Sequence, residues 1–360
     1  MDYVFLVVVF FNIIWYKFIY EMGQCGEQLI SILLSTASAT FHAPIVKRCN
    51  MKKFLCIILS AALLLLCACA APTQNSETSD ATEEVQYDLT PLCDGKTLKV
   101  LAIGNSFSDN TTNYLYDIAK AEGMTDVVIG RLYIGACTVQ QHLGNATNNL
   151  PNYTYSKNNS GAWIATDNAT LLYGLQDEDW DIITLQQSSG SSGLPGTYEG
   201  CLEQLIAYVN ENKTNPDAKL VWHMTWAYQQ DSTHSAFPDY NNSQEKMYQY
   251  ICQTVQQTVT PTGAFAAVIP AGTAIQNART SVVGDALTID GYHLNTLGEV
   301  IGSYTWYAIF VGKPLEAINH TWVKSNYKLT DENKAVIIDA VNGALRNPYT
   351  VTQSSVTSRK

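Results

Sequence analysis

One stretch of the chain reads Leu98-Lys99-Val100-Leu101-Ala102-Ile103-Gly104-Asn105-Ser106-Phe107-Ser108. Its first six residues are almost entirely apolar, which predicts a strand that is buried on both faces of a parallel sheet. Ser106 follows directly and precedes the next expected helix. The carboxyl ends of the strands line the ligand crevice in open α/β sheets, so we expect Ser106 in such a crevice. Alternatively, Ser106 simply caps the helix.

Strands and helices alternate along the rest of the domain. Further apolar runs predict strands at 127–133, 181–185, 219–224 and 266–269, and amphipathic segments predict helices at 111–121, 198–210, 244–259 and 296–310. Asn295 is the expected cap of the last helix. Residues 152–175 carry aromatic side chains on both sides of an Asn/Gly turn, which predicts an inserted β-hairpin. The pattern indicates an α/β fold with a mostly parallel five-stranded sheet, covered by helices on both faces.

A second motif lies near the C-terminus and reads Asp290-Gly291-Tyr292-His293. A serine hydroxyl is a weak nucleophile unless a base accepts its proton, and the base needs a third group that orients it. The short spacing lets Asp290 hold one ring nitrogen of His293 while the other nitrogen faces Ser106. The alternative is a loop in which both side chains bind backbone groups.

Taken together, Gly104-Asn105-Ser106 after the first strand and Asp290-x-x-His293 before the last helix resemble the SGNH/GDSL hydrolase superfamily. The resemblance spans residues 98–313 and implies a three-layer α/β/α, flavodoxin-like sandwich with Ser106, His293 and Asp290 as catalytic residues. The superfamily often reads Gly-Asp-Ser where this chain has Gly-Asn-Ser. The Gly-x-Ser-x-Gly motif of α/β-hydrolases does not fit, because Ser108 stands where that motif needs glycine.

The resemblance also implies an oxyanion hole, which binds the negative oxygen of the reaction intermediate. Its expected donors are the amides of Ser106 and Gly135 and an asparagine side chain after the third strand. The chain has Gln186 and Gln187 at that place, so we expect Gln187, or failing that Gln186, to donate its side-chain amide. This substitution marks a divergent branch.

Several tryptophans are candidate substrate contacts. Trp222 and Trp226 lie at and after the fourth strand, and Trp163 lies in the hairpin. Aromatic faces near an active site stack on sugar rings, whereas core packing is the alternative for each of them.

The N-terminal region resembles a bacterial lipoprotein signal. Met51-Lys52-Lys53 precedes an apolar run and then Leu66-Cys67-Ala68-Cys69, so residues 51–69 are expected to direct export and Cys69 to carry lipid. An ordinary signal peptide or a membrane anchor is the alternative. A signal works from an N-terminus, so we expect translation to begin at Met51 and residues 1–50 to be an upstream extension. The alternative there is a membrane span at 4–16, which is short for that purpose.

Composition sets further limits. The chain of 360 residues has a formal net charge of −11, which disfavours nucleic acid as a partner. Residues 70–88 have the composition of a flexible tether, 89–350 form one domain, and 351–360 are expected to be a disordered tail. The cysteines and histidines lack metal-ligand spacing, and there is no Gly-rich phosphate loop, so neither a metal nor a cofactor is expected.

These features predict a serine esterase of the bacterial cell envelope, lipid-anchored or secreted, that cleaves O-acyl and especially O-acetyl esters of carbohydrates. The alternative is a non-catalytic lipoprotein that binds glycans on a hydrolase scaffold.

Overall fold

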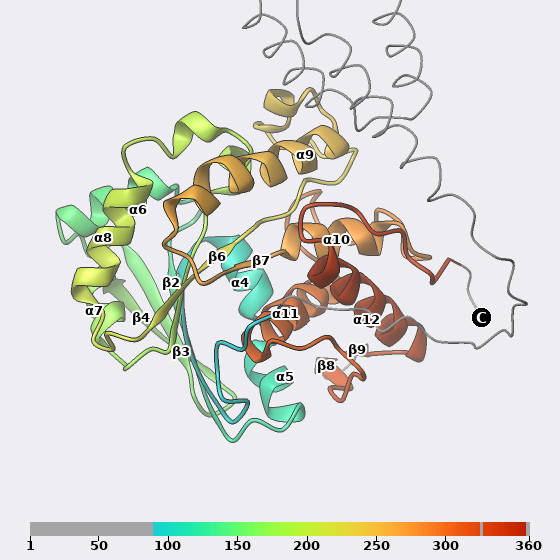
Figure 1. Cartoon of the computed structure of the whole chain (residues 1–360), viewed down its shortest axis with the longest axis horizontal. Coiled ribbons are helices and arrows are strands. Elements are labelled where there is room, and N and C mark those ends of the chain that lie inside the picture. The colour runs from blue at the N-terminus through green and yellow to red at the C-terminus, as the bar shows by residue number, and fades with distance from the viewer. Residues whose placement is uncertain (1–88, 325–326, 358–360) are drawn as a thin grey trace, which may run out of the picture. The chain divides into compact units, whose positions relative to one another are not determined.

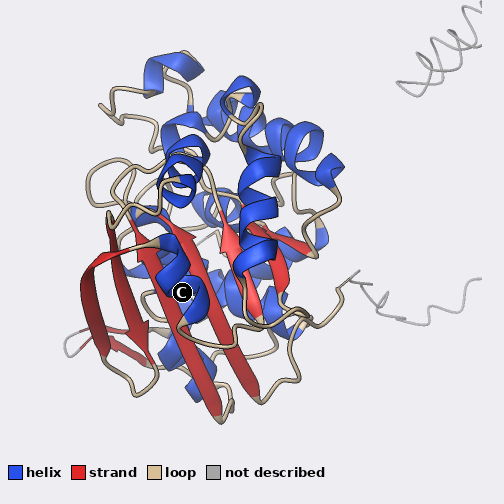
Figure 2. Cartoon of the chain, turned by 90° about the vertical axis from the view of Figure 1, so that its left-hand side faces the viewer, coloured by secondary structure: helices blue, strands red, loops and turns tan. Residues whose placement is uncertain are grey.

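The computed structural model describes residues 89–324 and 327–357. The centre of this part is a seven-stranded sheet in the order β4-β3-β2-β1-β5-β6-β7, seen side by side as one twisted sheet in Figure 2. Its strands are β1 (Thr97–Gly104), β2 (Asp126–Tyr133), β3 (Tyr153–Asn158), β4 (Trp163–Ala169), β5 (Ile182–Leu185), β6 (Lys219–His223) and β7 (Ala267–Ile269). A separate two-stranded sheet joins β8 (Trp322–Lys324) to β9 (Tyr327–Lys328).

The five expected strands form the parallel part of the sheet. β1 pairs with β2 on one side and β5 on the other, and β6 and β7 continue outward from β5. The five-strand count is too low, because the predicted hairpin does not stand apart from the sheet. Its strand β3 pairs antiparallel with β2, with Tyr155 opposite Leu132, so β3 and β4 extend the sheet at that edge.

Helices cover both faces of the sheet and give the three-layer α/β/α arrangement (Figure 1). One layer holds the helices that pack around α11, and the other holds α6, α7 and α8. The helices are α4 (Ser106–Thr112), α5 (Leu115–Ala121), α6 (Val139–Thr147), α7 (Leu171–Gln176), α8 (Leu202–Asn212), α9 (Gln244–Thr254), α10 (Ala271–Arg279), α11 (Thr296–Val311) and α12 (Asp331–Arg346).

The start of the first helix differs from the expectation. Helix α4 begins at Ser106 rather than at residue 111, because the Asn105 side chain accepts a hydrogen bond from the Phe107 amide and caps the helix there. A break then separates α4 from α5. The predicted cap of the last sheet-covering helix is confirmed, since the Asn295 side chain accepts from the Gly298 amide at the start of α11.

The expected disordered tail is wrong for residues 351–357. Backbone amides of this segment donate to the side chains of α10 and its C-cap, with Thr352 bound to Asn277 and Ser354 bound to Thr280. The amide of Val282 also donates to the carbonyl of Val356. The segment is therefore part of the domain, because each of these bonds satisfies a backbone group.

The predictions for residues 1–88, including the upstream extension, the signal sequence with Cys69 and the tether, lie outside the described residues. Within the described ranges, no helix combines the length and the apolarity needed to cross a membrane.

Candidate active site

The structure brings the two distant motifs together at the carboxyl edge of the sheet. Nε2 of His293 lies 2.8 Å from the Ser106 hydroxyl oxygen, and Nδ1 lies 2.7 Å from Oδ2 of Asp290. Ser106 follows β1, which sits between β2 and β5, where the chain order of the sheet reverses. This switch point is the usual ligand position in open α/β sheets.

The turn that carries Asp290 fixes the tautomer of His293. Oδ1 of Asp290 accepts from the backbone amides of Tyr292 (3.1 Å) and His293 (2.8 Å), so the carboxylate is held inside its own turn. An ionised carboxylate only accepts, so Nδ1 of His293 must carry the hydrogen, and Nε2 is left to accept from Ser106. Burial raises the pKa of Asp290, but the hydrogen bonds from His293 and Tyr292 outweigh it and hold that pKa below its usual value.

Local packing explains why Ser106 stands where it does. A side chain at Gly104 would collide with the side chains of Ser108 and Gln186, so only glycine fits at the end of β1. Asn105 then caps α4, which places Ser106 at the first position of the helix. The amide of a first helical residue has no partner within its helix.

The loop after β6 holds the Asp290–His293 turn from the other side. Nε1 of Trp226 donates to the carbonyl of Tyr292, and the amide of Gln229 donates to the carbonyl of Gly291, both at 2.8 Å. The Trp226 ring also stacks on Phe107, with ring centres 4.0 Å apart. One aromatic pair therefore connects the helix that begins at Ser106 with the turn that carries His293.

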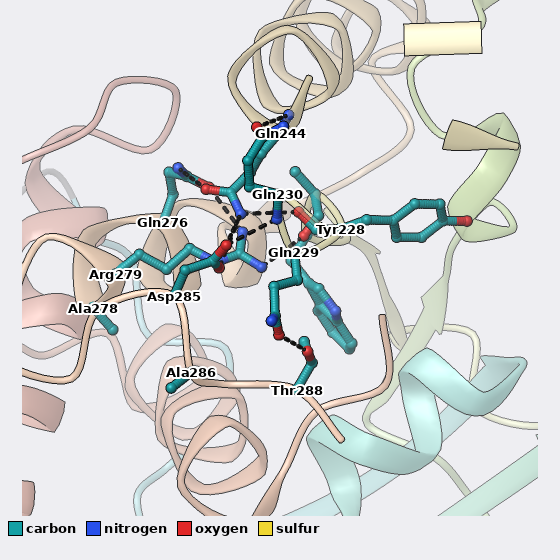
Figure 3. Close-up of polar contacts among 12 residues, drawn as sticks. Tyr228, Gln229, Gln230, Gln244, Gln276, Ala278, Arg279, Asp285, Ala286 and Thr288 are labelled. Atoms are coloured by element: carbon teal, nitrogen blue, oxygen red, sulfur yellow. Dashed lines mark hydrogen bonds and ion pairs between the residues drawn. The ribbon is translucent and has the colours of Figure 1, made fainter. Parts of the chain in front are cut away.

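A polar network fastens the chain segment that leads into this turn (Figure 3). Its centre is the buried guanidinium of Arg279, whose Nε lies 2.8 Å from Oδ1 of Asp285. The Asp285 carboxylate also accepts from the Gln230 amide and from the Gln244 side chain. Nearby, the Thr288 hydroxyl donates to Oε1 of Gln229. The network joins the loops on both sides of the site to α9 and α10.

Neither predicted glutamine serves as an oxyanion donor in this arrangement. Nε2 of Gln187 donates to the carbonyl and hydroxyl oxygens of Thr197, and its Oε1 accepts from the Val139 amide. Nε2 of Gln186 donates to Oδ1 of Asn105 at 2.6 Å. Both side chains are only 1% exposed, because they close the ends of strands instead of lining the crevice. The prediction for both side chains is therefore wrong.

The predicted tryptophan contacts also need correction. Trp222 and Trp226 are 1% and 0% exposed and pack in the core, so they cannot offer a face to a sugar. Trp163 is partly exposed, but the Arg131 guanidinium lies 3.5 Å over its ring. Its register places it opposite Asn158 and thus level with Ile129 in β2, four residues short of the carboxyl edge. That is about 13 Å along the strand.

Two partly exposed rings that were not predicted as site residues lie beside His293. The Tyr292 ring centre is 4.3 Å from that of His293, and the His234 ring centre is 4.7 Å from that of Tyr292. Burial lowers the pKa of His234, and the neighbouring His293 ring lowers it further because two protonated rings would repel each other. Tyr292 stands inside the motif itself, which was the signal available; nothing in the sequence near His234 indicates its position.

Gly135 follows β2 at the same edge and is exposed.

The described residues contain no group of three or more side chains that could hold a metal ion. Cys93, Cys137, Cys201 and Cys252 are free thiols.

Comparison with known proteins identifies the family but gives no activity. A family model described as a domain of unknown function, DUF4886, matches residues 99–340. A crystal structure of a DUF4886 family protein from Bacteroides uniformis shares 36% identity and a TM-score of 0.65, and the match covers 72% of this chain and 98% of that one. No curated protein matches the chain.

Two more distant solved structures each have a TM-score of 0.41. One is a putative SGNH hydrolase from Slackia heliotrinireducens, with 19% identity over 59% of this chain and 97% of that one. Another is a catalytic mutant of an acetylxylan esterase from Geobacillus stearothermophilus, with 12% identity over 61% of this chain and 96% of that one. The family model and the Bacteroides protein together show that the chain belongs to the DUF4886 family.

Proposed function

We propose that this protein is a serine hydrolase that cleaves carboxylic esters through an acyl-enzyme. The observation that carries the proposal is the continuous pair of hydrogen bonds from Ser106 to His293 and from His293 to Asp290. A serine, a histidine in the accepting tautomer and an orienting carboxylate are the three parts that such a nucleophile needs.

The geometry supports the following sequence of steps. The Ser106 oxygen attacks the ester carbonyl carbon while Nε2 of His293 takes the hydroxyl proton. The imidazolium, stabilised by Asp290, then gives this proton to the departing alcohol, and Ser106 keeps the acyl group. Water, activated by the same imidazole, attacks the acyl-enzyme, releases the acid and returns the serine.

The negative oxygen of each tetrahedral intermediate needs donors. With both glutamine side chains committed elsewhere, the proposed oxyanion hole consists of the backbone amides of Ser106 and Gly135. Backbone amides that are already fixed in place stabilise a developing charge without reorganisation, which is usually a large part of the rate enhancement.

For the substrate we propose an uncharged O-acyl ester, with an O-acetylated carbohydrate as the first candidate. The acidic chain disfavours anionic substrates, and the partly exposed Tyr292 ring beside His293 offers a flat apolar face to a sugar. The buried tryptophans no longer support this choice.

The test compares the purified full chain with the Ser106→Ala variant on 4-nitrophenyl acetate and then on acetylated xylan. We expect the variant to lose at least about 10³-fold in kcat, because it lacks the nucleophile. The matched control is Ser160→Ala, an exposed serine in the turn between β3 and β4, which should retain the full rate.

A fluorophosphonate probe provides a second readout. It should label the wild type and Ser160→Ala at Ser106 and leave Ser106→Ala unlabelled, as mass spectrometry of the peptide would show. Equal hydrolysis by the wild type and Ser106→Ala would refute the Ser106 mechanism, and no hydrolysis by the wild type would leave the non-catalytic glycan-binding alternative.

A further inference from the structure

A buried polar chain lies directly behind the nucleophile and joins the ends of β1, β5 and β6. Its centre is Gln186, whose Oε1 lies 2.5 Å from the Ser108 hydroxyl and 2.8 Å from Nδ1 of His223. Its Nε2 donates to Oδ1 of Asn105 at 2.6 Å. All four side chains are at most 2% exposed.

These bonds leave a single orientation for each amide. The backbone amide of Phe107 can only donate, so it fixes Oδ1 of Asn105 as an acceptor, and the side-chain NH2 of Gln186 must point at that oxygen. Oε1 of Gln186 then faces His223, whose ring is kept neutral near pH 7 because burial lowers its pKa to about 3, so Nδ1 carries the hydrogen and donates. Oδ1 of Asn105 accepts from Gln186 and from the Phe107 amide, so its Nδ2 is turned towards the carbonyl of Cys137, 3.2 Å away.

The Cys137 carbonyl belongs to the turn that presents Gly135. Ala136, between them, has a φ of 52°, a left-handed conformation that costs an L-residue about 1 kcal/mol. Such a conformation persists only when surrounding contacts hold it. Asn105 binds the turn at Cys137, and Gln187 binds the backbone two residues later through the Val139 amide.

We propose that Asn105 and Gln186 form a positioning pair for the oxyanion hole, an inference that rests on the esterase function proposed above. Gln186 orients the amide of Asn105. Asn105 then fixes both donors at once, because its Oδ1 caps the helix that starts with Ser106 and its Nδ2 holds the turn that carries Gly135. Neither side chain touches the substrate.

The first test is Gln186→Met, which keeps the volume of the side chain and removes all three bonds. Donors that bind only the negative oxygen act in the transition state, so we expect kcat on 4-nitrophenyl acetate to fall about 10- to 100-fold with KM within about twofold of the wild type. Circular dichroism gives the folded fraction by which each rate is corrected. If Gln186→Met has the kcat of the wild type, or differs from it only by a higher KM, the inference is overturned.

Thr273→Val is the matched control for a merely structural effect. Thr273 is buried in α10, and its hydroxyl binds the Pro348 carbonyl and the Tyr248 hydroxyl, away from the site. This variant should lose a comparable part of its thermal stability and keep its kcat. An equal fall in kcat for both variants would mean that Gln186 supports the fold and nothing more.

A double-mutant cycle tests whether Gln186 acts through Asn105. If it does, the Asn105→Ala/Gln186→Met double variant should be no more than about twofold slower than Asn105→Ala alone. A double variant whose loss in kcat equals the product of the two single losses would contradict the coupling. Asn105→Asp should also lose kcat, because a carboxylate caps the helix but cannot donate to Cys137.

Ser106→Ala separates the two proposals. If it hydrolyses ester as fast as the wild type, the Ser106 acyl-enzyme mechanism fails and the positioning inference fails with it. If Ser106→Ala is inactive and Gln186→Met has full activity, only the positioning inference fails.

Discussion

Asp290 has both carboxylate oxygens engaged within four residues of chain. One oxygen accepts two backbone amides and the other accepts the His293 ring. Gly291 makes this turn possible, because its φ of 90° is a conformation that favours glycine. A side chain at this position would also lie very close to Ser232. The spacing Asp-x-x-His therefore encodes the local geometry of the pair, which is why the sequence alone could predict this contact.

Asp290→Asn tests the orienting role. An amide in this place can donate to Nδ1 of His293 and so favours the tautomer with hydrogen on Nε2, which cannot accept the Ser106 proton. We expect kcat to fall about 10³- to 10⁴-fold with little change in KM, as measured by steady-state kinetics at pH 7.5. A loss of tenfold or less would show that Asp290 does not set the tautomer.

The two glutamines, in contrast to the Asp290–His293 pair, have contacts that the sequence alone did not predict. Gln186 and Gln187 lie at the correct edge of the sheet, as the strand pattern predicted, yet their amides bind Asn105 and Thr197. The direction of a buried amide depends on partners that are distant in sequence, such as His223. Strand pattern could therefore place these residues but could not assign their function.

At the scale of elements, the chain before the Asp290–His293 turn is held in place by side chains that belong to no sequence motif. Arg279 ends α10, and Asp285 lies in the loop that follows. The Arg279 side chain is 3% exposed. Burial lowers the pKa of Arg279 to about 10, although the nearby charge of Asp285 acts in the opposite direction. This ion pair and its glutamine partners could not be predicted, because they connect two loops and two helices that are distant in sequence.

Asp285→Asn removes the charge that compensates the buried Arg279. The Asp285 carboxylate is about one-third exposed, so solvent reduces the effect, and we expect a loss of about 1–3 kcal/mol in the free energy of unfolding. Urea denaturation measures it. Asp339→Asn should cost less than about 1 kcal/mol, because this carboxylate is partly exposed and binds Ser355 through solvent-exposed hydrogen bonds. Equal losses would contradict the structural role of the pair.

At the scale of the whole molecule, alternation of buried strands and helices was enough to predict the layers and the parallel core. The strands of this core have few exposed positions, so apolar runs reveal them directly. The edges were harder to predict. The hairpin extends the sheet through backbone pairing with β2, and the C-terminal segment binds α10 through individual hydrogen bonds. Neither kind of contact produces a periodic pattern of side chains, so the sequence did not reveal them.

Two histidines buried on different sides of the domain should make its stability depend on pH. His142 lies in α6 and His223 ends β6, and burial lowers the pKa of each to about 3. A histidine in the unfolded chain has a pKa near 6.5, so the unfolded state binds more protons below that pH. The contribution of the two neutral histidines to the free energy of unfolding is complete above about pH 6.5 and is lost as the pH falls towards 3.

His142→Gln measures one of these two contributions. Glutamine keeps a polar partner for the Tyr153 hydroxyl, which lies 2.8 Å from Nδ1 of His142, but it does not titrate. Between pH 6 and 5, where most carboxylates stay charged, the free energy of unfolding of the wild type should fall more steeply than that of the variant, by about 1 kcal/mol per pH unit. Between pH 7.5 and 8.5 the two slopes should agree. Urea denaturation at each pH gives these slopes, and parallel curves between pH 6 and 5 would mean that His142 is protonated in the folded protein.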